Sequence, residues 1–185
     1  MAVFAGLTCA LAGCGGSKSS GPGAEHPLTA QQAALFEDGV DMLEDPNALQ
    51  DTWRTDWDQE TRERIAQSDQ IALGDVTTVR TQEDPGQTVS YYVVISVAKT
   101  LLGEPVGSEL VLTAREGAAG YGKLGEQRDR LLRKSVVAFV KHAKEGTRVV
   151  SHFHLAMPSQ PVFAAIDQYK RKSGNEVRII THTQQ

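Results

Sequence analysis

Residues Thr88–Thr100 read TVSYYVVISVAKT, and this stretch decides the fold class. Its β-branched and aromatic residues favour a β-strand, and neither proline nor glycine interrupts it. Ile71–Arg80 ahead of it places apolar residues at a period of two, and Asp84-Pro85-Gly86 between the two segments is a turn signal. The centre of the chain is therefore predicted to consist of two long strands joined by a turn.

Three further strands are expected towards the C-terminus, over Glu109–Ala114, Ser135–His142 and Arg148–Met157. A charged helix over Glu126–Lys134 separates the first of these strands from the second. The glycine-rich segment Gly117–Gly125 lacks the Gly-Lys-Ser/Thr ending of a phosphate-binding loop, and we expect a mobile loop there. The order of three strands, a helix and two strands is that of the OB-fold, a five-stranded Greek-key barrel.

Helices are expected to flank this barrel. Thr29-Ala30-Gln31-Gln32 has the spacing of a capping box, and the helix that it begins should run until Asp45-Pro46 stops it. A second helix should extend from about residue 47 to residue 67. A third is expected over 161–172, and Val177–Thr181 is predicted to form a closing strand. The predicted fold class is mainly β, an OB-like five-stranded barrel with two N-terminal helices and a C-terminal helix.

Two tryptophans mark the apolar stripe of the second N-terminal helix. Trp53 and Trp57 are four residues apart and share one helix face, and Glu60 and Arg64 interrupt the stripe beyond them. Such a pair usually packs an amphipathic helix onto a core, so we expect both indoles to be buried. The alternative is an exposed recognition face.

Composition sets the class of protein. Of the 185 residues, 40% are hydrophobic and 23% are charged, as in a soluble globular domain, which excludes collagen-like, coiled-coil and wholly disordered chains. The two cysteines, Cys9 and Cys14, both precede the body of the chain, so no disulfide framework holds that body together.

The N-terminus has the features of a targeting segment. Residues 1–13 are apolar or small, as in a secretory signal, and Leu11-Ala12-Gly13-Cys14 resembles the lipobox of bacterial lipoproteins. This resemblance implies cleavage before Cys14 and attachment of diacylglycerol to its thiol, which anchors the chain to membrane lipid. Gly15 is not the Asp that resembles an inner-membrane retention signal, so we expect an outer-membrane anchor facing the periplasm.

The domain prediction follows from this anchor. We expect a signal peptide over 1–13, an acylated flexible tether over 14–28, and a single OB-like domain over 29–185 whose N-terminal helical segment is 29–68.

The body of the chain resembles a second family. Three short motifs are similar to those of netrin-like OB-fold domains, which include the tissue inhibitors of metalloproteases: Ile65-Ala66 with Asp69, Ala72-Leu73-Gly74-Asp75-Val76, and Lys99-Thr100-Leu101-Leu102-Gly103. The resemblance spans roughly 65–157 and implies the fold. This sequence lacks the cysteines that staple the animal members, and the resemblance implies no activity.

His152-Phe153-His154 is the sharpest candidate for chemistry. Alternation along a strand places both imidazoles on one face, where two ligands can share a metal ion. A tight zinc site needs three or four ligands, and the candidate further ligands are His142 on the neighbouring strand and an Asp or Glu on a loop. The competing interpretation places both histidines on the solvent face while Phe153 and Leu155 point inward. We adopt it and expect no metal and no cofactor.

Nucleophilic catalysis has no motif in this sequence. The Gly-x-Ser-x-Gly elbow is missing, and Ser151 is next to His152 only along the chain, because neighbours on a strand point to opposite faces. We therefore predict that the protein is not an enzyme.

Charge is distributed unevenly. Residues 37–69 hold eleven acidic and three basic residues, whereas 70–185 hold fifteen basic and eleven acidic residues. A basic rim on an OB barrel is typical of proteins that bind a polyanion. Because we expect the protein to face the periplasm, we expect no nucleic-acid partner. The interpretation that we adopt is that the acidic helices pack near the basic barrel and neutralise it in part. The alternatives are a polyanion and a surface for a partner protein, whose candidate residues are Arg128, Arg130, Arg133 and Lys134.

Three functions remain open on the sequence. The first is a non-enzymatic binding or assembly module for an envelope protein complex, held at the outer membrane through Cys14. The second is a metal-binding protein or metal-dependent hydrolase that uses His152 and His154. The third, by analogy to the netrin-like group, is an inhibitor or immunity protein of an envelope enzyme.

Overall fold

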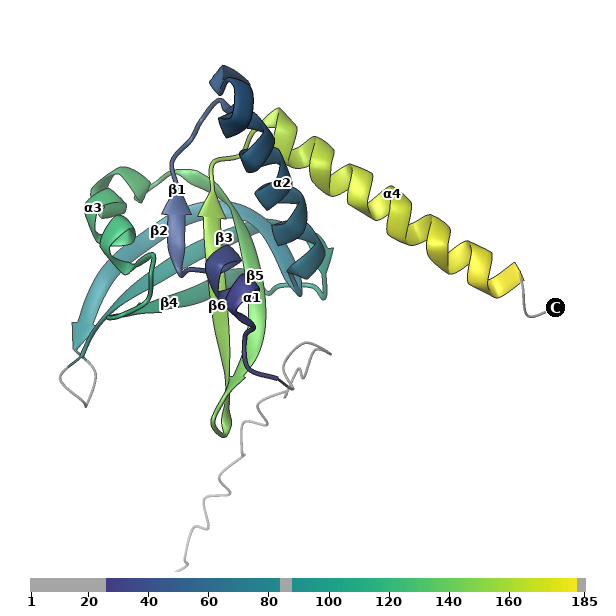
Figure 1. Cartoon of the computed structure of the whole chain (residues 1–185). Helices are drawn as coiled ribbons and strands as arrows, with labels where there is room; N and C mark the ends of the chain where they lie inside the picture. Colours follow the sequence, from purple (N-terminus) through teal and green to yellow (C-terminus); the bar gives the residue numbers. More distant parts are fainter. Residues whose placement is uncertain (1–25, 84–87, 183–185) are drawn as a thin grey trace, which may run out of the picture.

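The structure is a computed structural model that describes residues 26–83 and 88–182, with side chains described as far as residue 174. It is mainly β, and one curled sheet carries four α-helices (Figure 1). In chain order the elements are α1 (Ala30–Leu35), β1 (Gly39–Asp41), a 3₁₀ turn (Pro46–Ala48), α2 (Asp51–Gln67), β2 (Gln70–Glu83), β3 (Val89–Gly103), β4 (Glu109–Arg115), α3 (Tyr121–Leu131), β5 (Ser135–Glu145), β6 (Arg148–Ala156) and α4 (Gln160–His182).

The sheet has six strands in the order β1-β6-β5-β2-β3-β4. The five strands predicted between residues 71 and 157 are present and pair antiparallel, and β1 adds a sixth by pairing parallel to β6. The sheet curls into a half-barrel in which β4 approaches β6 without a hydrogen-bonded ladder in the described residues. The prediction of a mainly β fold with flanking helices is confirmed.

The two faces of the sheet have separate apolar cores. On the inner face, Val93, Ile95, Phe153 and Leu155 are fully buried and pack with Leu124 of α3. On the outer face, α1, α2 and the first turns of α4 cover the sheet; their buried side chains are Leu35, Phe36, Ile65, Val162 and Ile166. Phe153 and Leu155 point inward as the sequence predicts, so His152 and His154 belong to the outer face.

The first predicted helix is too long. The capping box of Thr29 and Gln32 is present, but α1 ends at Leu35 and the chain then forms β1. Asp38 adopts a left-handed φ of 58°, which a helix does not allow. Its main-chain N–H donates to the carbonyl of Phe153 at 2.9 Å and docks this segment on β6.

Two further expectations are wrong. The glycine-rich segment is not a loop throughout, because α3 begins at Tyr121, and Gly120 sits so close to β1 that an added Cβ would lie 2.4 Å from the Cα of Gly39. Val177–Thr181 does not form a strand, because the backbone of α4 continues as a helix through His182.

Within the described residues, no helix has both the length and the apolar composition needed to cross a bilayer.

Candidate binding site

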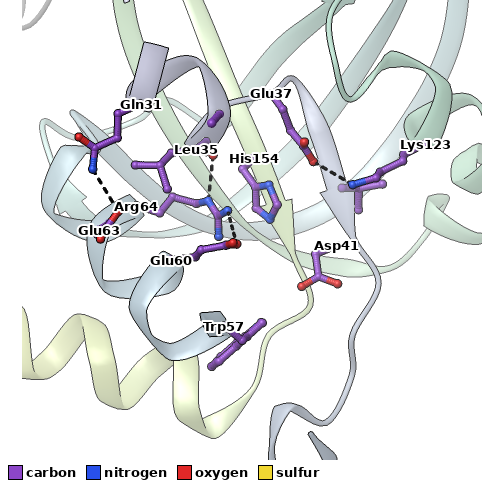
Figure 2. Close-up of a pocket in the computed structure, with 12 residues that line it drawn as sticks. Gln31, Leu35, Glu37, Asp41, Trp57, Glu60, Glu63, Arg64, Lys123 and His154 are labelled. Carbon is purple, nitrogen blue, oxygen red and sulfur yellow. Dashed lines mark hydrogen bonds and ion pairs between the residues drawn. The ribbon is translucent and has the colours of Figure 1, made fainter. Parts of the chain in front are cut away.

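A pocket of about 630 Å³ lies where α1, α2, β1 and α3 meet β6, and we call it the His154 pocket (Figure 2). This volume is within the range of small-molecule sites. The imidazole of His154 lies between Arg64 on one side and Asp41 on the other. The polar and aromatic lining residues are Gln31, Glu37, Asp41, Trp57, Glu60, Glu63, Arg64, Lys123 and His154.

His154 is the least satisfied polar group of this pocket. The residue is 5% exposed, and neither Nδ1 nor Nε2 has a hydrogen-bond partner among the described residues. Burial, together with the charges of Arg64 and Lys123, lowers the pKa of His154 well below its usual range. The ring is therefore neutral near pH 7 and offers one donor and one acceptor. An unsatisfied buried polar group costs about 1–3 kcal/mol, which a bound ligand can offset.

Arg64 is a buried cation beside this imidazole. Its side chain is 9% exposed, and Nε donates to the carbonyl of Leu35 at 2.9 Å. The carboxylate of Glu60 lies 3.8 Å from one terminal nitrogen, beyond hydrogen-bond distance, and is itself 64% exposed. Burial lowers the pKa of Arg64, but a guanidinium stays protonated in proteins. Its terminal nitrogens make no hydrogen bond to any described residue.

The remaining charges at the pocket are mostly acidic. Lys123 of α3 pairs with Glu37 at 3.5 Å, while Asp41 accepts a hydrogen bond from the main-chain N–H of Leu43 through Oδ1 at 2.9 Å. Counting all lining residues, four carboxylates face two cations, a net charge of −2. The pocket therefore disfavours a ligand with several negative charges.

His152 lies on the same face of β6 but has a different environment. Its Nδ1 is 3.1 Å from Oδ2 of Asp38, and its Nε2 is 3.1 Å from Oε1 of Glu145. Asp38 is buried and uses Oδ1 to accept the main-chain N–H of Phe153 at 2.9 Å. The hydrogen bond to Asp38, and to a lesser degree the charges of both carboxylates, raises the pKa of His152. Each ring nitrogen of His152 thus already has a partner.

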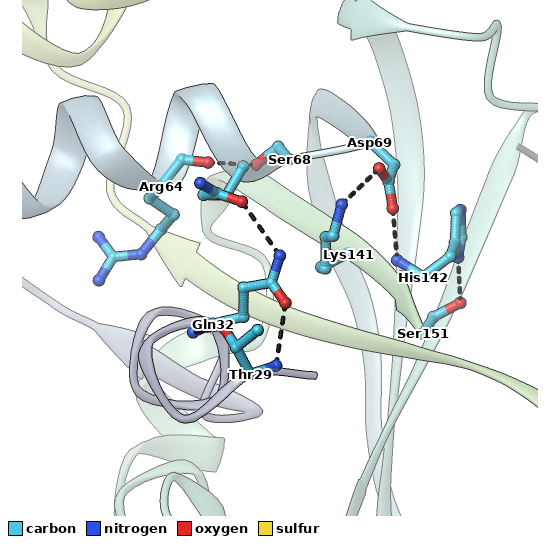
Figure 3. Close-up of polar contacts among 9 residues, drawn as sticks. Thr29, Gln32, Arg64, Ser68, Asp69, Lys141, His142 and Ser151 are labelled. Atoms are coloured by element: carbon cyan, nitrogen blue, oxygen red, sulfur yellow. Dashed lines mark hydrogen bonds and ion pairs between the residues drawn. The ribbon is translucent and has the colours of Figure 1, made fainter. Parts of the chain in front are cut away.

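His142 does not join the other two histidines. Its residue number has the parity of Val140, which packs in the inner core, so the ring lies on the opposite face of the sheet. Nδ1 is 3.0 Å from Oγ of Ser151, as Figure 3 shows. Burial lowers the pKa of His142. Among the described residues, no group of three or more His, Cys, Asp or Glu side chains is arranged to hold a metal ion.

The Ser151–His142 contact does not complete a triad. Asp69 is close, but its Oδ2 accepts from the main-chain N–H of His142 at 2.7 Å, and its Oδ1 lies 2.7 Å from Nζ of Lys141 (Figure 3). The carboxylate therefore fixes the start of β2 to β5 and does not orient the imidazole. Sequence reasoning placed Ser151 away from His152 correctly and did not find its contact with His142.

The predicted partner-binding residues are exposed side chains of α3 and the turn after it. Arg128 contacts its neighbour Asp129 at 3.5 Å, and Arg130 donates to Gln127 at 3.0 Å. Lys134 pairs with Glu44 at 3.2 Å, and Arg133 has a φ of 66°. These four residues lie outside the His154 pocket. Cys14 and the lipobox lie outside the described residues.

The two tryptophans of α2 differ in burial. Trp57 packs against the outer core and borders the His154 pocket, with the guanidinium of Arg54 5.6 Å from its ring centre. Trp53 is 75% exposed, so the prediction that both indoles are buried is wrong for this residue. Helix α2 contacts α4 and α1 but leaves the face of Trp53 uncovered.

No family model, curated protein or solved structure matches this chain. The site is therefore interpreted from its own geometry.

Proposed function

We propose that this protein is a lipid-anchored, non-enzymatic binding module of a bacterial cell envelope, and that it binds an envelope protein through α2. The observation that carries the proposal is the exposed indole of Trp53. Tryptophan is enriched among the residues that dominate protein interfaces, because a large flat side chain buries much apolar area with few rotatable bonds.

The position of Trp53 supports this role. Residue Trp57, one turn further along α2, packs on the outer core, so the helix is fixed on the sheet by one indole and presents the other to solvent. The surrounding helix carries five acidic and three basic residues. A partner surface with an apolar pocket and a basic rim complements this face.

The proposal also includes the lipid anchor and an OB-type topology for the sheet. The lipobox Leu11–Cys14 supports acylation at the outer membrane, facing the periplasm. The order β6-β5-β2-β3-β4, with α3 between β4 and β5 along the chain, supports an OB-type barrel whose seam between β4 and β6 stays open. The Ser151–His142 pair without an orienting acid supports a role other than catalysis.

In-cell photo-crosslinking tests the proposal. A photoreactive residue at Asp56, an exposed position one turn from Trp53, should yield a discrete crosslink to one envelope protein. Trp53→Ala should abolish that crosslink. Val149→Ala, which truncates another exposed apolar side chain (57% exposed), is the matched control and should leave it intact. A crosslink that survives Trp53→Ala, or none at all, contradicts the proposal.

The anchor has its own test. Cells fed a labelled fatty acid should incorporate the label into the wild-type chain and not into Cys14→Ser, because a serine hydroxyl cannot form the thioether. Label retained on Cys14→Ser would contradict lipidation at this residue.

A further inference from the structure

We propose that the His154 pocket binds a small zwitterion, a free amino acid or a short peptide, whose carboxylate meets Arg64 and His154 and whose ammonium group meets the carboxylate of Asp41. This inference is separate from the binding of a protein partner through Trp53.

Two buried groups, Arg64 and His154, form the end of the pocket that would receive the carboxylate. Arg64 donates one hydrogen bond to the described residues, from Nε to the carbonyl of Leu35 at 2.9 Å. Its terminal nitrogens make none, and the exposed Glu60 is their ion-pair neighbour at 3.8 Å. A planar guanidinium with free terminal nitrogens matches a carboxylate, which it can hold through two parallel hydrogen bonds. The unpartnered imidazole of His154 lies beside it and can donate one more.

The surplus of carboxylates over cations in the pocket favours a ligand that carries an ammonium group. Lys123 pairs with Glu37, and Arg64 lies 3.8 Å from Glu60, so both cations already have a neighbouring acid. Asp41 has no ion-pair partner among the described residues and faces the same cavity as His154. A cationic group on the ligand would meet this carboxylate. A simple anion such as phosphate could contact Arg64 and His154, but it carries no ammonium group for Asp41. The net charge of −2 on the lining residues would repel it.

The size and walls of the pocket fit this class. A volume of about 630 Å³ holds an amino acid or a short peptide with room for a side chain. Leu35, Val40 and Trp57 supply the apolar part of the wall, where the side chain of the ligand would pack. Arg64 and His154 occupy the buried end, so the carboxylate would enter first.

Calorimetric titration of the full chain in detergent tests the inference. The probes are the twenty protein amino acids and the dipeptides of alanine with each of them, at up to millimolar concentration. At least one should bind. Its N-acetyl and C-terminal amide derivatives, which lack the ammonium and the carboxylate respectively, should each bind at least about tenfold more weakly. Inorganic phosphate is the probe for a plain anion site.

Variants then place the ligand in the pocket. His154→Leu removes both ring nitrogens, and Arg64→Lys keeps the charge while removing the two-nitrogen fork, so each should weaken binding by about tenfold or more. Asp41→Asn retains the acceptor for the Leu43 N–H and should remove most of the preference for the free ammonium over its N-acetyl form. Lys144→Gln, an exposed lysine outside the pocket, is the control and should bind normally.

Three results would overturn the inference: no probe binds, phosphate binds as tightly as the best zwitterion, or Asp41→Asn and Arg64→Lys bind like the wild type. Circular dichroism of each variant separates lost binding from lost folding, and Asp41→Asn is the variant least able to disturb the fold. The photo-crosslink from α2 is read independently, so failure here leaves the protein-binding proposal standing.

Discussion

His152 and His154 share one strand, one face of the sheet and one residue type, yet their environments are opposite. His152 lies between two carboxylates, Asp38 and Glu145, and both of its ring nitrogens have partners. His154 lies two residues further along β6, under α1 and α2, beside Arg64 and with neither ring nitrogen bonded among the described residues. Two residues of chain thus separate a structural histidine from a binding candidate.

The alternation of side chains along β6 predicts the face that each histidine occupies but not its environment. The alternation fixes which face a side chain occupies, because successive strand residues point to opposite sides. It carries no information about what covers that face. The covering elements come from residues 30–41 and 51–67, more than eighty positions away along the chain.

We expect the greatest loss of stability on removing the carboxylate of Asp38, which contacts both His152 and the main chain of β6. Asp38→Ala loses the acceptor for the buried Phe153 N–H and the partner of His152, and it places alanine at a φ of 58°. We expect a loss of about 3 kcal/mol in the free energy of unfolding, measured in denaturant at pH 6.

Asp38→Asn is the matched control for this prediction. Asparagine tolerates a left-handed φ and keeps an oxygen for the Phe153 N–H, while the atom that faces His152 loses its charge and changes from an acceptor to a donor. Its loss should be less than half that of Asp38→Ala. Equal losses would mean that the carboxylate charge, and not the hydrogen bond to the main chain, is the larger effect.

The next effect is the pH dependence due to His154. Because its pKa is lowered in the folded state, the unfolded chain binds the proton more readily below the unperturbed pKa of about 6.5. Stability contributed by the neutral ring is complete above about pH 6.5 and falls as the pH drops, with a limiting slope of about 1.4 kcal/mol per pH unit for one proton. His154→Leu should reduce this acid-side slope in denaturant titrations between pH 4 and 6.5 and leave the part due to His142, whose pKa is also lowered. A slope unchanged in the variant would mean that another group causes it.

His152 should show a slope of the opposite sign. Its pKa is raised, so its contribution is complete below about pH 6.5 and is lost as the pH rises through the folded value. Glu145 is 45% exposed and solvent screens its charge, so we expect about 1 kcal/mol in total. His152→Gln should flatten the decline between pH 6.5 and 8 and leave the acid side unaltered, as followed by melting temperature.

The smallest effect is expected where both partners are exposed. Lys134 and Glu44 pair at 3.2 Å with side chains that are 48% and 70% exposed. Lys134→Gln should change the free energy of unfolding by no more than about 0.5 kcal/mol at any pH. A larger change would show that burial is not what separates His152 and His154 from surface charges.

Sequence reasoning recovered the elements whose signals are local. The capping box at Thr29, the five long strands and the inward direction of Phe153 and Leu155 all follow from patterns a few residues wide. It missed β1, because Leu35, Phe36 and Val40 also fit a helical spacing. The Asp38-Gly39 dipeptide was the available signal, since this pair favours a turn and ends a helix.

The candidate site was less accessible from sequence. In the sequence, Arg64 interrupts an apolar stripe, whereas in the structure it is a buried wall of the pocket. The sequence predicts that His154 lies on the solvent face and that Trp53 is buried; in the structure His154 is 5% exposed and Trp53 is 75% exposed. Each error has the same physical origin. Burial on the outer face depends on how α1 and α2 lie over β6, and this packing is non-local.

The contact between Gly39 and Gly120 has a consequence for how this protein can evolve. Neither glycine lines the His154 pocket, but an added Cβ on Gly120 would lie 2.4 Å from the Cα of Gly39, so any side chain there forces β1 and α3 apart. Those two elements carry Asp41 and Lys123. In descendants of this sequence, ligand preference can therefore change through substitutions of the lining residues. The two glycines must be retained together, because they set the distance between β1 and α3.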